Sequence, residues 1–177
     1  VTIAKNTGTP TVLCMPSTFQ YDGTEKTPTV VVRDNAQRII PESEYTVSFS
    51  LTPMIAVKTY TVTVTDKPGG NYEFTTPATG NFAIVEASQN PLSIITDKPT
   101  DVFYGDTFRL SAMGGSGSGA IHWSIKESNN VATINGNGVV TVIGTGGFTV
   151  QAYREASSGY SQSNTDSVPF VAHPKPV

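Results

Sequence analysis

The chain has 177 residues and a formal net charge of −3 at pH 7, and its Lys and Arg residues are scattered along the sequence. No cationic track is present to neutralise a row of phosphates, which argues against a nucleic-acid-binding protein. Only 14% of the residues are charged, against ~25% in typical soluble domains. Thr, Ser, Gly, Pro and Asn take their place, a mixture that favours strands joined by turns over helices. No stretch approaches the ~20 apolar residues of a membrane-spanning helix.

The first half of the chain alternates apolar residues with hydroxyl-bearing ones. Thr29–Arg33 carries three successive Val residues, and Tyr45–Phe49 and Tyr60–Thr65 alternate with a period of two. This is the period of a strand that buries one face. Turn signals separate these segments at intervals of about ten residues, which is typical of a β-sandwich. The predicted core residues of this half are Tyr45, Val47, Val62 and Val64.

The second half repeats the pattern between Gly105 and Ala152, a stretch that holds the only Trp of the chain. Its large residues again occupy every second position, so three strands with one buried face are predicted. Such strands need a second sheet to cover them, and we expect Trp123 near the middle of the resulting core. The residues of these runs are Phe108, Leu110, Ile121, Trp123, Ile125, Phe148, Val150 and Ala152.

The best domain boundary lies at Glu86–Pro91, after a completed strand, where Pro91 forces an extended entry into the next segment. The sequence therefore predicts an all-β chain of two tandem sandwiches joined by a short linker. The first comprises residues 1–87, the linker 88–91, the second sandwich 92–172 and a Pro-rich tail 173–177. With neither a start Met nor a signal peptide, the chain is expected to derive from a longer protein.

The first half resembles the short immunoglobulin-like repeats of bacterial surface proteins, in which a YDGT-type turn precedes one strand and a GNY-type turn another. The resemblance covers most of residues 10–86 and departs from the pattern at Leu51–Lys58, where the family has an Asn- and Gly-rich turn. The segments that carry it are Phe19–Pro28, Val30–Val32, Glu44–Val47, Tyr60–Thr65 and Gly70–Tyr72.

Residues 102–153 are similar to the group 2 bacterial immunoglobulin-like repeats. The sequence departs from that pattern in the glycine-rich loop Gly114–Gly119 and in a polar insertion at Glu155–Asn164. The segments that carry the similarity are Gly105–Ala112, Ile121–Ile125, Val131–Asn135, Gly138–Thr141 and Gly147–Ala152. The two resemblances imply tandem immunoglobulin-like modules of a cell-surface or secreted protein.

Residues able to perform chemistry are few. Alternation turns His122 to the outer face of its strand, His173 falls in the Pro-rich tail, and Cys14 lies between apolar neighbours that favour burial. Two isolated histidines and one cysteine do not assemble a zinc site, and no nucleophile elbow is present. The Gly114–Gly119 loop lacks the Lys-Ser/Thr ending of a phosphate cradle and reads as a flexible hairpin loop. The sequence therefore predicts no catalytic, cofactor-binding or metal-binding residues and no cofactor.

One acidic group raises a calcium hypothesis. Asp97, Asp101 and Asp106 are expected near the domain junction, where calcium can stiffen tandem sandwiches. The alternative is that they are turn-forming residues, a role for which Asp is favoured.

Three tyrosines raise a second hypothesis. Tyr104, Tyr153 and Tyr160 are candidates for a sugar-stacking face, and the alternative is that they pack at strand ends with their hydroxyls in water. A Lys–Asn cross-link, known in some sandwich domains, has no matching motif here.

The function expected from the two resemblances is that of a non-catalytic spacer or structural module in a larger bacterial cell-surface or secreted protein, with an adhesive module as one form of it. The alternatives are a module that binds host glycan or protein through loops such as Gly114–Gly119 and Glu155–Asn164, and accessory domains of a secreted hydrolase. The expected partners are the flanking domains of the same polypeptide, and the module is expected to be a monomer.

Overall fold

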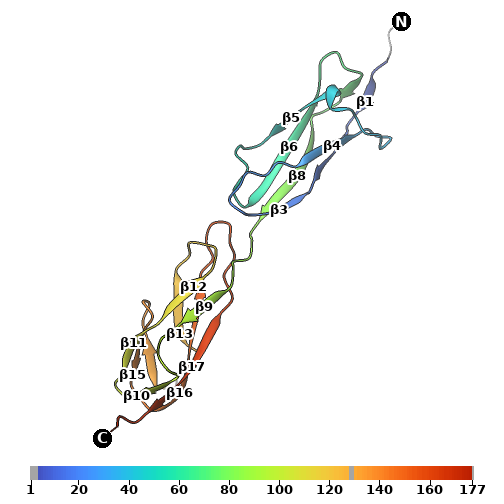
Figure 1. Ribbon diagram of the computed structural model, residues 1–177. Coiled ribbons are helices and arrows are strands. Elements are labelled where there is room, and N and C mark those ends of the chain that lie inside the picture. The colour runs from blue at the N-terminus through green and yellow to red at the C-terminus, as the bar shows by residue number, and fades with distance from the viewer. Residues whose placement is uncertain (1–3, 128–129, 177) are drawn as a thin grey trace. The chain divides into compact units, whose positions relative to one another are not determined.

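The computed structural model describes residues 4–127 and 130–176, and its chain divides into two compact units (Figure 1). Unit 1 is Val1–Ala87 and unit 2 is Ser88–Val177. Within the described residues, no helix has the length and apolar character needed to cross a membrane. The one helical element in that part of the chain is a single 3₁₀ turn, η1 (Glu42–Glu44).

Unit 1 is built around a sheet in the order β3-β8-β6-β5, against which the β2-β4 pair packs. A third, two-stranded sheet pairs β1 with β7 in parallel. The strands described in unit 1 are β1 (Asn6–Gly8), β2 (Thr11–Met15), β3 (Thr18–Gln20), β4 (Thr29–Arg33), β5 (Tyr45–Phe49), β6 (Lys58–Asp66), β7 (Tyr72–Phe74) and β8 (Ala78–Val85).

The core of unit 1 follows the alternation of its strands. On β6, Tyr60, Val62 and Val64 are at most 1% exposed, and Tyr45 is also buried, as predicted. Val47 is 38% exposed, however, so its assignment to the core is wrong. It lies opposite Val64 on β5, which is an edge strand of the sheet, and it lines an open hollow together with Val30 of β4.

The segment at which unit 1 departs from its resemblance, Leu51–Lys58, closes one end of the sandwich. Met54 is 2% exposed and belongs to the core. Its carbonyl oxygen accepts a hydrogen bond from Lys26 N at 2.9 Å. In the same turn, hydrogen bonds from Lys26 and Thr24 hold the pKa of Asp22 well below its usual range. The YDGT turn and the Met54 loop therefore brace each other.

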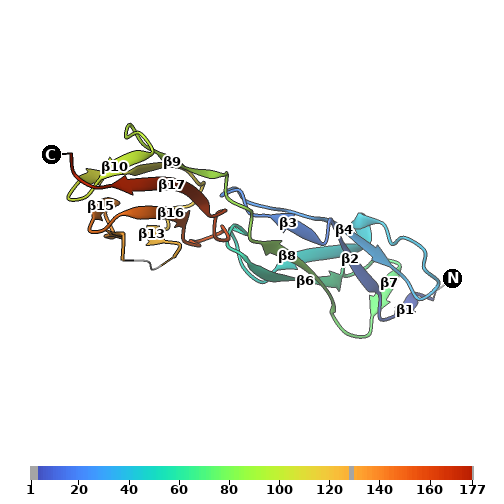
Figure 2. The same cartoon turned by 90° about the horizontal axis from the view of Figure 1, so that it is seen from below.

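Unit 2 has a sheet in the order β10-β17-β16-β13, faced by the sheet β11-β15-β14 and the pair β12-β9. Figure 2 shows β17 beside β10 and β16 in this unit. The strands described are β9 (Leu92–Ile95), β10 (Asp101–Phe103), β11 (Thr107–Arg109), β12 (Ser111–Gly114), β13 (Ile121–Ile125), β14 (Ala132–Ile134), β15 (Val139–Val142), β16 (Gly146–Arg154) and β17 (Asp166–His173).

The core of unit 2 centres on β15, β16 and β17. Val140 and Val150 are fully buried, and the Phe170 ring lies 5.3 Å from the ring of Phe148. Trp123 is only half-buried and packs against the margin of this cluster, so its predicted central position is wrong. The prediction of an all-β chain with two tandem sandwiches is confirmed.

In both units the last strand pairs in parallel with a strand near the beginning of the unit. β8 pairs with β3 in unit 1, and β17 pairs with β10 in unit 2. Val171 N donates to Thr100 O at 2.8 Å, so alternate residues of β17 direct their N–H toward β10. Pro169 lies on that same edge just before β10 begins, where its missing N–H removes no ladder bond.

Candidate functional site

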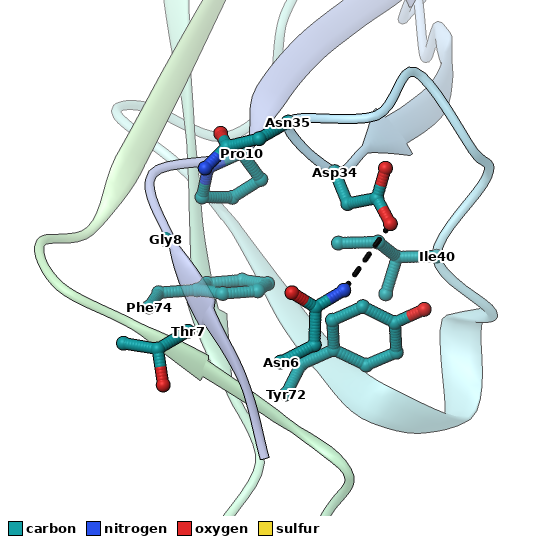
Figure 3. Close-up of a pocket in the computed structure, with 9 residues that line it drawn as sticks. All are labelled: Asn6, Thr7, Gly8, Pro10, Asp34, Asn35, Ile40, Tyr72 and Phe74. Atoms are coloured by element: carbon teal, nitrogen blue, oxygen red, sulfur yellow. Dashed lines mark hydrogen bonds between the residues drawn. The ribbon is translucent and has the colours of Figure 1, made fainter. Parts of the chain in front are cut away.

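A small, partly open pocket at one end of unit 1 gathers polar side chains from distant segments (Figure 3). Asn6 from β1 points its amide toward the carboxylate of Asp34, which follows β4, and Nδ2 donates to Oδ2 at 3.2 Å. Tyr72, Phe74 and Ile40 surround this pair. The cavity measures about 10 Å³, which is the space of one water molecule. A larger ligand does not fit.

Asp34 acts within this pocket as an organiser of its own loop. It is 6% exposed, and its Oδ1 accepts from the backbone N of Ala36 and Arg38 at 2.9 and 3.0 Å. Burial by itself raises the pKa of Asp34, but the hydrogen bonds from Arg38 and Ala36 and the Arg38 charge outweigh it, so the pKa lies below its ordinary value. A carboxylate held ionised by neighbouring donors stabilises the loop and is a poor general base.

The glycine-rich loop Gly114–Gly119 is fastened to its neighbours, contrary to the expectation of a flexible loop. Arg154 donates through Nη1 to Gly119 O at 2.7 Å and through Nε and Nη2 to Gly114 O at 3.3 Å. Gln89 accepts from Gly117 N and donates to Ser161 O at 2.8 Å. The loop therefore has a defined conformation set by long-range hydrogen bonds.

The two histidines differ in their position and in their partners. His122 is exposed on the outer face of β13, as predicted, and its ring stacks on Tyr153 with 5.0 Å between centroids. His173 is the last residue of β17, so its assignment to the Pro-rich tail is wrong. Its Nε2 lies 2.8 Å from Oδ1 of Asp101. Within the described residues, neither ring is paired with a Ser, Thr or Cys side chain.

The aspartates of the calcium hypothesis do not come together. Asp101 is engaged by His173, and Asp106 Oδ2 accepts from Phe103 N at 3.2 Å within its own turn. Both lie at the end of unit 2 where β17 finishes, away from the linker residues, which contact the loop after β12. Among the described residues, no group of three His, Cys, Asp or Glu side chains is arranged to hold a metal ion.

The three tyrosines of the sugar-stacking hypothesis do not share a face. Tyr104 N donates to His173 O, beside the start of β16, whereas Tyr153 lies near the end of that nine-residue strand. Eight residues of strand span roughly 25 Å. Tyr160 belongs to the turn after β16, where it pairs with Ser157. These rings therefore do not form one platform for a sugar.

Cys14 is buried at 7% exposure, as predicted, on the inward face of β2. Burial raises the pKa of its thiol, which leaves the sulfur protonated near neutral pH and chemically inert.

No protein-family model matches this chain, and no curated protein matches it either. Solved structures do match. Domains 1–6 of the surface-layer protein SbsC are 19% identical, with a TM-score of 0.41, over 94% of this chain and 27% of that one. Mouse cadherin-23 EC22-24 is 16% identical, with a TM-score of 0.39, over 93% of this chain and 67% of that one.

A C-terminal 282-residue fragment of intimin, solved with the intimin-binding domain of the translocated intimin receptor, is 13% identical. That match has a TM-score of 0.33 and covers 92% of this chain and 63% of the fragment. The chain spans 33% of a matching protocadherin gammaB4 extracellular domain, which is 16% identical with a TM-score of 0.36.

The polar residues that organise both units were missed by the sequence reasoning. Asp34, Gln89 and Arg154 each bind backbone groups of segments far along the chain or of their own loop. For Asp34 a signal is present in the sequence, because Asp followed by Asn is typical of a turn in which the carboxylate accepts nearby N–H groups. Gln89 and Arg154 carry no such local signal.

Proposed function

We propose that this chain is a non-catalytic structural module of a larger bacterial cell-surface or secreted protein, in which tandem sandwiches act as a spacer that resists extension. The resemblance to bacterial surface repeats supports the location. The pocket around Asp34 supports the absence of catalysis, because both oxygens of this carboxylate accept hydrogen bonds from the protein itself. The parallel pairing of the last strand of each unit with an early strand supports the mechanical role.

The parallel pairing determines how a pull is carried. In unit 2, β10 leads back to the beginning of the unit and β17 leads to its end, and the two run in the same direction. A force that separates the two ends therefore slides β17 along β10. It loads the bonds Val171 N to Thr100 O and Tyr104 N to His173 O together, both at 2.8 Å. Shear of this kind breaks several bonds at once, whereas peeling breaks them one by one.

Unit 1 has the same arrangement between β3 and β8. Ala83 N donates to Ser17 O and Tyr21 N to Val85 O, each at 2.9 Å, at the two ends of the parallel pair. The strands β1 and β2 of unit 1 and β9 of unit 2 precede these pairs and lie outside them. In each unit the last strand is held by bonds that a pull loads in shear. This is the property that a spacer holding a distal domain away from a surface requires.

The joint between the units is proposed to be short. Gln89 and Asn90 are hydrogen-bonded to loops of unit 2, through Ser161 O and Ser116 Oγ at 2.8 and 3.0 Å. Half of the predicted linker 88–91 is thereby hydrogen-bonded to the second sandwich. Few residues remain to act as a hinge.

The mechanical role is tested by pulling the whole chain from its two ends in single-molecule force spectroscopy. Val171→Pro removes the donor to Thr100, while Val171→Ala keeps it and trims a side chain that is 46% exposed. We expect Val171→Pro to lower the force of one of the two unfolding events and Val171→Ala to leave both unchanged. Equal unfolding forces in the two variants would contradict the proposal. Antibody labelling of intact source cells tests the location.

A further inference from the structure

In unit 2, the sheet β11-β15-β14 and the pair β12-β9 leave part of the sheet β10-β17-β16-β13 uncovered. The β14–β15 hairpin turns at Asn135–Gly138, and Leu110 N donates to Gly138 O at 2.8 Å where this hairpin meets the end of β11. Beyond that point, β12 pairs with β9 along one of its two edges. Within the described residues, no strand pairs with the other edge of β12. The result is a notch of about 520 Å³ between β12 and β13, which we call the β12–β13 notch.

Apolar side chains of β13 line the notch from inside. Ile121 and Trp123 are half-buried and pack against the margin of the core. The backbone of Gly138 fixes the indole, because a Cβ atom there would stand 3.1 and 3.2 Å from Cε2 and Cζ2 of Trp123. The hairpin tip thus contacts one side of the indole ring, and another part of the ring lines the notch.

The charge of the notch has one sign. Arg154 lies directly across from Ile121 in the β13–β16 register, which places it on the inward face with Trp123. Its partners, Gly114 O and Gly119 O, are neutral carbonyls. A guanidinium has five N–H donors, so one remains on each of its two terminal nitrogens. Arg109 is exposed at the rim.

No carboxylate balances these two cations. The residues that line the notch include Arg109 and Arg154 but neither Asp nor Glu, although the whole chain has more acidic than basic residues. In the described part of the chain, neither arginine forms an ion pair. The notch therefore offers the fixed guanidinium of Arg154 and the exposed guanidinium of Arg109, and its lining holds no competing carboxylate.

We propose that the β12–β13 notch binds an acidic saccharide, namely an oligosaccharide of hexuronic acid residues. Its volume falls within the ~300–1,000 Å³ of small-ligand sites. Guanidinium groups bind carboxylates through paired hydrogen bonds, and an indole offers an apolar surface to the C–H face of a sugar ring. Asn137 and Ser111 add a side-chain amide and a hydroxyl at the rim for sugar hydroxyl groups.

The shape of the notch favours a saccharide over an extended acidic peptide. A peptide that adds to a sheet needs a run of free strand edge. The edge of β12 offers only Ser111–Gly114, with the hairpin tip at one end and the fastened Gly114–Gly119 loop at the other. This inference is independent of the spacer role.

Trp123 is the only Trp of the chain and lines the notch, so its fluorescence reports binding directly. The whole chain is titrated with a hexuronic acid oligosaccharide, with a neutral hexose oligosaccharide of equal length and with a poly-glutamate peptide. Two variants of equal net charge are compared. Arg109→Gln removes a cation of the notch, and Lys126→Gln removes an exposed cation that does not line it. Urea unfolding of both variants checks that unit 2 remains folded.

The expected result is a saturable fluorescence change with the hexuronic acid oligosaccharide only. Arg109→Gln weakens this binding about tenfold, the loss expected for a hydrogen bond between charged groups, and Lys126→Gln leaves it unchanged. The proposal is overturned by an absent response, by an equal response to the neutral sugar, or by equal weakening in both variants. Preferential binding of poly-glutamate also overturns it, and assigns the notch to a peptide.

Discussion

Glu44 and Asn71 are joined by two hydrogen bonds through a single carboxylate. Glu44 Oε2 accepts from the backbone N of Asn71, and Oε1 accepts from its Nδ2 at 3.0 Å. Asn71 O in turn accepts from Asn6 N at 2.9 Å. The pair thus fastens η1 and the turn before β7 to the first strand of unit 1. This gives the GNY-type turn of the sequence a structural role.

We expect Glu44→Ala to destabilise unit 1 by about 1–2 kcal/mol, because both Asn71 donors lose a half-buried charged acceptor. Urea unfolding followed by NMR amide signals of unit 1 measures the change. Glu42→Ala, which removes an exposed carboxylate of the same turn, is the control and should shift the free energy of unfolding by less than about 0.5 kcal/mol.

Gly70→Ala tests the same contact from the other side. A Cβ atom at this position would stand 2.5 Å from Glu44 Oε2, so the carboxylate has to move and its bonds to Asn71 are lost. The substitution should therefore cost about as much as Glu44→Ala, and the double variant little more than either alone. Additive losses in the double-mutant cycle would show that the two residues act independently.

Two glycines of unit 2 should differ in how much stability they lose on substitution by Ala. Gly114 has a φ of +99°, and a Cβ atom there would overlap Pro91 O, whereas Gly136 has no atom within 4 Å of that position. We expect Gly114→Ala to cost more than about 2 kcal/mol and Gly136→Ala to remain within about 0.5 kcal/mol of the parent. Trp123 fluorescence during urea unfolding measures both, and similar losses would refute the close approach of Pro91.

Acid should weaken unit 1 in part through Asp34. The pKa of this carboxyl is lower in the folded state than the ~3.9 of an unfolded chain, so its contribution is complete above that value and is lost as pH falls through the folded pKa. Asp34→Asn should therefore lower stability at pH 7 and flatten its decline below about pH 4. Urea unfolding at a series of pH values measures this contribution, and an acid decline of equal steepness in the parent and in Asp34→Asn would contradict it.

The core of unit 2 should be more sensitive at Phe170 than at Trp123. Phe170 is 1% exposed and contacts both Phe108 and Phe148 with 5.3 Å between ring centroids, whereas Trp123 is half-buried. We expect Phe170→Ala to cost ~3–5 kcal/mol and Trp123→Ala roughly 1–3 kcal/mol, by circular dichroism during urea unfolding. A larger loss of stability in Trp123→Ala than in Phe170→Ala would show that Trp123 is the more central core residue.

Alternation along the strands predicted the fold class and most of the core, because period-two burial is a local property. It placed Val62, Val64 and Val150 correctly. It failed for Val47 and Trp123, since alternation identifies the inward face of a strand but not how far the opposite sheet extends over it.

The polar contacts were beyond the reach of sequence reasoning for a different reason. The partners Asn6 and Asp34 are 28 residues apart, and Glu44 and Asn71 are 27 apart. Only the pairing of strands brings such residues together. The β12–β13 notch depends in the same way on where one hairpin happens to end.

The attachment of Gln89 has a practical consequence for anyone producing the C-terminal half alone. Its side chain holds Gly117 N, Glu155 O and Ser161 O, all of them distant in the chain. A recombinant fragment that starts at Pro91 would omit this residue and leave those three backbone groups without it. A fragment that starts at Ser88 or earlier keeps the hydrogen bonds of Gln89 to these loops.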